Sequence, residues 1–182
     1  MTNNRLFSSV APLTVILYCL AASAASAPKS ATVSMTDSQG KKVGSVTIRP
    51  AGTGVVLELN LKHMPPGEHA IHFHEVAKCD PPDFKSAGPH FNPEKKEHGL
   101  QNPKGHHAGD MENFTVTAKG NATQIHITDR DVTLGGGPNS IFANGGTSIV
   151  VHAKPDDMHT DPSGNSGDRI ACGVVSPHHH WF

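Results

Sequence analysis

Six histidines and one aspartate in this 182-residue chain are spaced so that their side chains could bind metal ions. They are His72, His74, His90, His98, His107, Asp110 and His152. Imidazole suits copper and zinc, and a carboxylate completes a ligand set that zinc accepts well. These ligands are enough for two ions that share one imidazole. The residues therefore predict a binuclear metalloenzyme with copper and zinc as cofactors.

Two of the histidines predict a strand that faces one ion. His72 and His74 lie two residues apart, so on a β-strand both side chains point to the same side. Phe73 then turns to the opposite layer. The apolar run at residues 148–151 predicts a second buried strand. His152 follows that run and supplies a third nitrogen from another strand.

A second group combines three imidazoles with one carboxylate, a set that suits tetrahedral zinc. Its members are His90, His98, His107 and Asp110. If His90 uses both ring nitrogens as an imidazolate, it can join the two sites. His106 is an alternative to the neighbouring His107, but the spacing to Asp110 favours His107.

Eight short stretches predict the strands that must position these ligands. They cover residues 32–35, 43–48, 55–61, 68–75, 113–118, 122–128, 147–153 and 170–175. The pair at 113–118 and 122–128 predicts a hairpin. Residues 76–111 show no periodicity, and no helix of normal length is expected. The predicted fold class is all-β: an eight-stranded Greek-key β-sandwich or barrel, immunoglobulin-like, with long metal-binding loops.

The composition and the first residues narrow the class of protein. The formal net charge of −1 leaves no basic footprint for nucleic acid. Residues 1–27 predict a signal peptide: Arg5 is its only charge, residues 10–22 are apolar, and Ala25-Ser26-Ala27 resembles a cleavage site. Cleavage is expected after Ala27, with Ala24 as the alternative. We expect a periplasmic or extracellular protein without stable membrane association.

The cysteines predict one disulfide. Cys19 leaves with the signal peptide, so that Cys79 and Cys172 remain. Two cysteines in an exported protein indicate a bridge. The alternative of two free thiols does not suit an oxidising compartment.

Several motifs resemble those of the copper/zinc superoxide dismutase family. They are residues 67–75 (GEHAIHFHE), 86–93 (SAGPHFNP), 98–99 (HG), 107–110 (HAGD), 150–154 (VVHAK) and 164–174 (GNSGDRIACGV). These motifs span the mature chain nearly end to end and in family order. The spacing of His90, His98, His107 and Asp110 matches the family as well.

The resemblance implies a role for each ligand. Copper would be held by His72, His74 and His152, zinc by His98, His107 and Asp110, and both by the bridging His90. Asp156, with Asp157 as the neighbouring alternative, resembles a carboxylate that hydrogen-bonds a copper ligand (His72) and a zinc ligand (His98) at once.

Other residues gain roles from the same resemblance. Arg169 resembles the cation that guides the anion to copper, which makes Arg169 and His90 the expected catalytic residues. Cys79 and Cys172 resemble the family's intrasubunit disulfide. His69 resembles a histidine with a packing role. The remaining histidines of the domain are expected on the surface: His63, His106, His126 and His159.

The resemblance also implies the activity. It indicates an oxidoreductase that converts superoxide to dioxygen and hydrogen peroxide by alternate reduction and oxidation of a copper bridged to zinc. The alternative is a non-catalytic copper carrier or buffer on the same fold. Superoxide is the expected partner, a homodimer is possible, and the oligomeric state stays open.

The expected boundaries are a domain at residues 28–176 and a histidine-rich tail at 177–182, for which a solvated end is favoured over metal scavenging. The segment 156–169 is shorter than the family's charged guiding loop. The sequence therefore does not rank Lys154 or other residues that steer the anion beside Arg169.

Overall fold

The computed structural model describes residues 30–177. The predicted signal peptide, residues 1–27, lies outside the described residues, and so does the predicted tail after Pro177. The described range covers almost all of the predicted domain, which begins at residue 28.

Nine β-strands and two short 3₁₀ helices make up the described part of the chain. The strands are β1 (Ala31–Asp37), β2 (Lys42–Ala51), β3 (Gly54–Leu61), β4 (Gly67–His69), β5 (Ile71–His74), β6 (Phe114–Val116), β7 (Ala122–Asp129), β8 (Thr147–His152) and β9 (Arg169–Val175). The helices are η1 (Lys85–Ala87) and η2 (Ala143–Gly145). The predicted all-β class is confirmed. Within residues 30–177, no helix has the length and apolar character needed to cross a bilayer.

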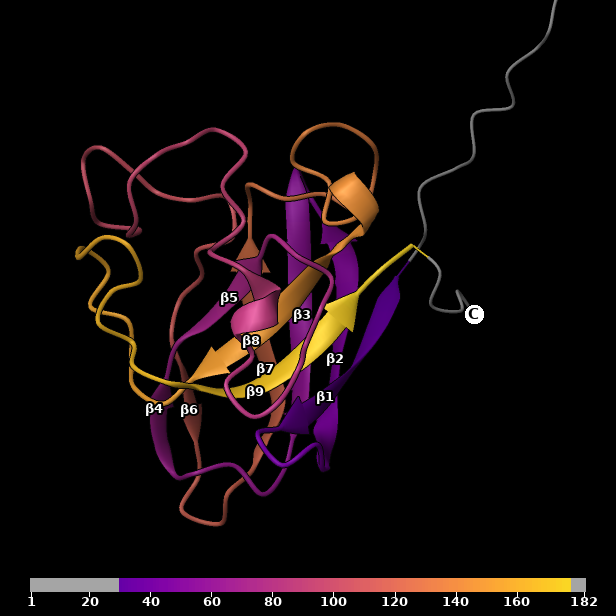
Figure 1. Cartoon of the computed structure of the whole chain (residues 1–182), viewed down its shortest axis with the longest axis vertical. Helices are drawn as coiled ribbons and strands as arrows, with labels where there is room; N and C mark the ends of the chain where they lie inside the picture. Colours follow the sequence, from indigo (N-terminus) through magenta and orange to yellow (C-terminus); the bar gives the residue numbers. More distant parts are fainter. Residues whose placement is uncertain (1–29, 178–182) are drawn as a thin grey trace, which may run out of the picture.

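The strands form a closed antiparallel arrangement. Seven of them make one sheet in the order β5-β8-β9-β1-β2-β3-β7, and β4 pairs with β6 in a second sheet. Because β4 leads into β5 and β6 leads into β7, the small sheet connects the two edges of the large one (Figure 1). The connections from β3 to β5 and from β7 to β8 cross between the edges of the sheet. The result is the predicted Greek-key barrel.

Two predicted elements differ from the structure. The predicted strand 68–75 divides at Ala70, whose N–H donates to Lys154 O and whose carbonyl accepts from His152 N–H, both at 2.9 Å. This division gives nine strands instead of eight. The predicted hairpin was wrong in its pairing, since β6 pairs with β4 and β7 pairs with β3. The three-residue β6 cannot offer β7 a ladder as long as the one along β3.

Alternation along the strands fills the barrel with apolar side chains. In β1, Val33 and Met35 are buried while Thr32 and Ser34 are exposed. Most of β3 follows the same rule, with its leucines in the core. This period of two is what one buried sheet face requires. It gives the ligand-bearing strands a rigid support.

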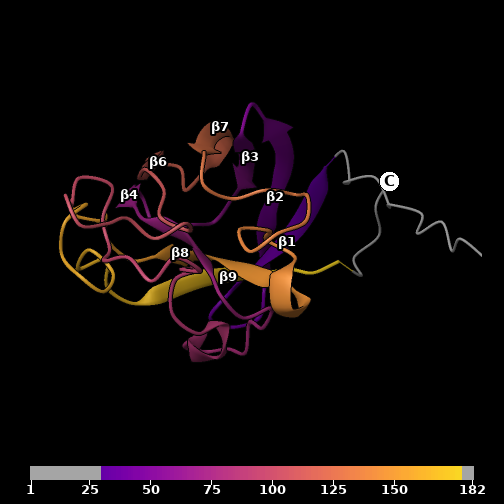
Figure 2. The same ribbon diagram turned by 90° about the horizontal axis from the view of Figure 1, so that it is seen from above.

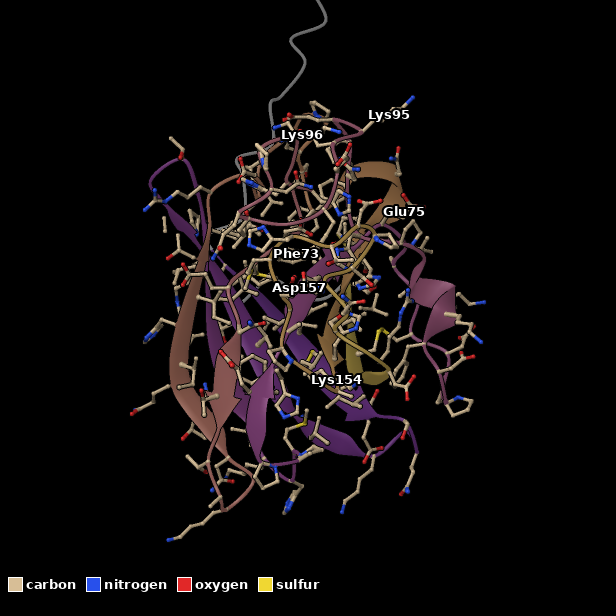
Figure 3. The ribbon with its side chains drawn as sticks, turned by 90° about the vertical axis from the view of Figure 1, so that its left-hand side faces the viewer. Phe73, Glu75, Lys95, Lys96, Lys154 and Asp157 are labelled. Carbon is tan, nitrogen blue, oxygen red and sulfur yellow. A yellow bond between two sulfur atoms is a disulfide. The ribbon has the colours of Figure 1, made fainter. Side chains whose placement is uncertain are left out.

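Two long loops lie side by side at one end of the barrel, residues 92–107 and residues 153–168 (Figures 1 and 2). Gln101 N–H donates to Met158 O at 3.0 Å across their contact. A side chain at Gly99 would collide with that same Met158 carbonyl, so the two backbones can approach only because of the glycine. Figure 3 shows Lys96 on the first loop and Lys154 on the second.

A third loop, which follows β5, is fixed to β9. Cys79 and Cys172 form a disulfide, with their Cα atoms 5.7 Å apart, which confirms the predicted bridge. Phe84 of this loop is fully buried and packs with Val150 and Cys172 in a cluster separate from the main core. The bridge and Phe84 together hold η1 against β8 and β9.

Candidate metal centre

The seven predicted ligands meet in one buried cluster, although they come from β5, β8 and the long chain between β5 and β6. These residues form two groups, and within each group the candidate ligand atoms all lie within 4.8 Å of one another. We call the first the all-histidine set: His72, His74, His90 and His152. We call the second the histidine–aspartate set: His90, His98, His107 and Asp110. His90 belongs to both sets.

Strand pairing positions the all-histidine set. β5 pairs with β8, and its alternation places His72 and His74 on one face of the sheet. His152 ends β8, just after a register shift against β9 that turns the last residue of the strand. His90 joins through an isolated bridge to His74, and the ring centroids of His72 and His90 are 4.0 Å apart.

Three rings of this set each turn one nitrogen outward to an acceptor. His72 Nε2 donates to Asp156 Oδ2 at 2.8 Å, His74 Nδ1 to Gly88 O at 2.9 Å, and His152 Nδ1 to Gly167 O at 3.2 Å. A neutral imidazole that donates from one nitrogen presents a lone pair on the other. The inward nitrogens therefore carry free lone pairs. The inward nitrogens of His74 and His152 lie 3.4 Å apart.

Asp110 is the centre of the histidine–aspartate set. Its Oδ1 lies 2.9 Å from His90 Nδ1, 3.0 Å from His98 Nδ1 and 3.3 Å from His107 Nδ1. Its Oδ2 accepts the backbone N–H groups of Gly99 and His107 at 2.9 and 3.0 Å. Three imidazole nitrogens thus gather around one carboxylate whose other oxygen is fixed by the backbone.

Asp156 connects the two sets. Its carboxylate lies 2.8 Å from His72 Nε2 and 2.9 Å from His98 Nε2. Asp157, the alternative considered from the sequence, instead accepts the backbone N–H groups of His159 and Thr160 within its own loop. Of the two carboxylates, Asp156 is therefore the one that contacts a ring of each set.

Burial keeps the all-histidine rings unprotonated. It lowers the pKa of His72 and of His152 to about 4 and the pKa of His90 to about 3. It also holds the pKa of His74 well below the ordinary value. Neutral imidazole is the form that binds a metal ion. At neutral pH these nitrogens are therefore ready to act as ligands.

Carboxylates dominate the charge on the other side of the cluster. Burial works against the protonated form of His98, but hydrogen bonds to Asp110 and Asp156 outweigh it and raise the pKa of His98 to about 9. Burial likewise works against the ionised carboxylates, yet their histidine hydrogen bonds hold the pKa values of Asp110 and Asp156 well below the usual range. Both carboxylates stay ionised at neutral pH.

Arg169 begins β9 next to the all-histidine set. Its Nη1 donates to Phe84 O at 2.7 Å and its Nη2 to Gly88 O at 2.8 Å. Gly88 O also accepts from His74, so one carbonyl contacts both the guanidinium and a ring of the set. The side chain is half-buried and held in place from the loop that the disulfide anchors.

The other histidines lie outside the cluster or at its edge. His106 Nε2 lies 2.9 Å from Asp131, while His107 faces Asp110. His69 is buried, with its ring nitrogens 2.8 Å from His152 O and 2.9 Å from Pro65 O, as a packing role would require. The last group is exposed: His63, His126 and His159.

Two supporting residues could not be found from the sequence. The Asn113 side chain donates to Asp156 O at 2.9 Å and accepts Asp156 N–H at 2.8 Å. Asp161 accepts the backbone N–H of His98 at 2.7 Å. Each contact joins residues more than forty positions apart, and no local pattern marks either side chain.

Unpartnered atoms test whether metal ions fit this cluster. His72 Nδ1 and His90 Nε2 are buried, and neither finds a hydrogen-bond partner within residues 30–177. A buried polar atom left in this state costs about 1–3 kcal/mol. Both atoms belong to the all-histidine set, whose donors suit copper, and the neighbouring set suits zinc. The donors therefore fit a copper ion and a zinc ion that share His90.

Comparisons with known proteins agree with this chemistry. The family described as copper/zinc superoxide dismutase matches residues 42–175. A copper–zinc superoxide dismutase of Aquifex aeolicus is 51% identical over 139 residues, which cover 75% of this chain and 82% of the relative. One from Caulobacter vibrioides is 45% identical over 148 residues, covering 80% and 85%. The structure of a superoxide dismutase-like protein from Bacillus subtilis superposes with a TM-score of 0.76 at 38% identity, covering 79% of this chain and 97% of that one.

Proposed function

We propose that this chain, which belongs to the copper/zinc superoxide dismutase family, converts superoxide to dioxygen and hydrogen peroxide. The observation that carries the proposal is the convergence of two ligand sets on one shared imidazole, that of His90. The all-histidine set would hold copper and the histidine–aspartate set would hold zinc. Every proposed ligand comes from one chain, so the centre needs no second copy.

Copper held by the all-histidine set would supply the one-electron redox chemistry of the reaction. Zinc held by the histidine–aspartate set has no redox role and would keep His90 in position. The outward hydrogen bonds of His72, His74 and His152 fix which nitrogen of each ring faces inward. His90 Nε2, a buried atom without a hydrogen-bond partner among residues 30–177, can hold one of the two protons that the reduced anion needs to become hydrogen peroxide, and the other comes from solvent. The guanidinium of Arg169 attracts and orients the anion.

The role of Arg169 provides the experiment that tests this function. We expect Arg169→Gln to lower kcat/KM for superoxide by about tenfold and to weaken its dependence on salt, because a positive charge at the site speeds anion capture. The measurement is stopped-flow superoxide decay with copper- and zinc-loaded protein at several ionic strengths.

The matched control for this variant is Arg49→Gln, since Arg49 pairs with Glu58 on the surface at 2.8 Å. Equal rates and equal salt dependence in the two variants would contradict the role of Arg169. If the wild-type protein consumes only one superoxide per copper, the chain is instead a copper carrier.

The Asp156 bridge leads to a prediction on metal affinity. Both carboxylate oxygens of Asp156 lie within 3.1 Å of His98 Nε2. In Asp156→Asn the NH2 group takes the place of one of these oxygens and faces the His98 ring N–H, and the negative charge shared by the two rings is lost. We expect zinc affinity to fall about 10- to 100-fold. Competition with a chromophoric chelator measures it. Asp157→Asn is the control, and an equal loss in that variant would show that the effect is not specific to the bridge.

The buried histidines lead to a prediction on pH. In metal-free protein, the unfolded chain takes up protons on His72, His90 and His152 below about pH 6.5, whereas the folded chain takes them up only near pH 3 to 4. The contribution of these three histidines to stability is therefore full above about pH 6.5 and is lost as the pH falls toward 4. His98 has the opposite sign, since its contribution is present below about pH 6.5 and is lost as the pH rises through about 9.

Urea unfolding at pH 7 and pH 5 checks the acid side of this profile. We expect a clearly lower midpoint at pH 5 in the metal-free protein. The loaded protein should show a smaller change between the two values, because bound ions compete with protons for the rings. Identical midpoints at the two pH values in metal-free protein would contradict the prediction.

We also propose that residues 1–27 are a signal peptide and that the mature chain works in the periplasm or the extracellular medium. The disulfide between Cys79 and Cys172 supports this location, because such bonds persist in oxidising compartments.

A further inference from the structure

An open groove at the surface is lined by four charged side chains, two of each sign. The cations are Lys85 and Arg169, and the anions are Asp83 and Asp168. Formally their charges cancel. A groove that captured an anion on charge alone would not be expected to carry two carboxylates.

The groove adjoins the all-histidine set through two carbonyl groups. Gly167, which lines the groove, accepts from His152 at 3.2 Å. Arg169, which also lines it, shares the carbonyl of Gly88 with His74. An anion that reaches Arg169 from this groove therefore stands beside the proposed copper ligands.

Asp83 is the carboxylate that acts on Arg169. Burial lowers the pKa of Arg169, and the negative charge of Asp83 opposes that shift. Asp83 also forms an ion pair with Lys85, whose Nζ lies 2.9 Å from Asp83 Oδ2, and it accepts the Lys85 backbone N–H at 3.1 Å. Both side chains are more than half exposed, so their charges act mainly through solvent at the mouth of the groove.

We infer that Asp83 restrains anion capture at Arg169 and that its ion pair with Lys85 sets the size of this restraint. Asp83 offsets part of the guanidinium charge, and Lys85 in turn offsets part of the Asp83 charge. The inference rests on the proposed function, because it assigns the approach path of the anion to the same centre.

The substitutions that test this inference keep the local fold. Asp83→Asn retains an oxygen for the Lys85 backbone N–H and removes the negative charge together with the Lys85 ion pair. We expect it to raise kcat/KM for superoxide about two- to threefold at low ionic strength. Lys85→Gln should lower the rate by a similar factor, and the double variant should return close to the wild-type rate. Both single-variant differences should vanish at about 0.5 M salt, where the screening length is only a few ångströms.

The same loop offers a matched control. Lys78 and Asp80 form an exposed ion pair at 2.8 Å, and neither residue lines the groove. Asp80→Asn and Lys78→Gln change the net charge of the protein by the same amounts as the test variants. If Asp80→Asn speeds the reaction as much as Asp83→Asn does, net charge alone explains the effect and the inference is overturned.

Azide, a small anion that binds copper(II), gives a readout that does not depend on turnover. Titration of the copper-loaded protein, followed by its visible spectrum, should show about two- to threefold tighter azide binding in Asp83→Asn at low salt. Unchanged azide affinity in Asp83→Asn overturns the inference even where dismutation is fast. Lack of superoxide turnover by the wild-type protein overturns the proposed function instead, and the azide titration still decides the role of Asp83.

Discussion

The His152→Ala variant is expected to lose superoxide dismutation by at least about a hundredfold, because weakening even a supporting contact of a metal site commonly costs 10- to 100-fold. His152 supplies an inward nitrogen from β8 that no other residue of that strand can replace. Its loss also leaves Gly167 O without the ring hydrogen bond. Stopped-flow superoxide decay, together with copper content by atomic absorption, measures the effect.

His126→Ala is the matched control for this variant, since His126 is an exposed histidine on β7. It should retain wild-type turnover and wild-type copper content. Near-normal dismutation by His152→Ala with a full copper content would show that the copper does not depend on His152. That result would contradict the assignment of the all-histidine set.

Removal of the disulfide is expected to give the largest loss of stability. Cys79 and Cys172 are 93 residues apart, and a bridge across a loop of that length contributes about 4–5 kcal/mol in the chain-entropy model. The double variant Cys79→Ala/Cys172→Ala should unfold at much lower urea concentration than the wild type. Activity should fall as well, because the anchored loop supplies both carbonyl groups that hold Arg169.

The single variant Cys79→Ala distinguishes the effect of losing the disulfide from the effect of losing the Cys172 side chain. Because one substitution already removes the bridge, we expect it to lose nearly as much stability as the double variant. A loss below about 1 kcal/mol in either variant would mean that the cluster around Phe84 and Val150 anchors the loop without the disulfide.

The sequence predicted the ligand strands well, because their information is local. Two histidines at alternate positions of one strand must share a face, and the apolar run before His152 could only be buried. The disulfide was equally accessible, since only two cysteines remain after the predicted cleavage. For the same reason the alternating strands β1 and β3 were found close to their true bounds.

The parts that the sequence did not predict depend on contacts between distant segments. The turn before β7 has a typical hairpin pattern. In the barrel, however, β7 pairs along β3 with a longer ladder than β6 could form, so the hairpin predicted from the turn does not form. Asn113 and Asp161 look like ordinary loop residues until the loop at residues 153–168 is placed against Asn113 and His98. The role inferred for the opposite charges of Asp83 and Lys85 likewise depends on the fold, which brings them into one groove with Arg169.

Counting superoxide turnovers per copper tests the central claim most directly. Wild-type protein without residues 1–27 would be loaded with copper alone, zinc alone, or both, and mixed with a hundredfold excess of superoxide. If the two ligand sets share His90, we expect many superoxide turnovers per copper with both ions bound and no turnover with zinc alone. Consumption of a single superoxide per copper, with no further decay, would contradict the claim and identify a copper-handling protein on the same fold.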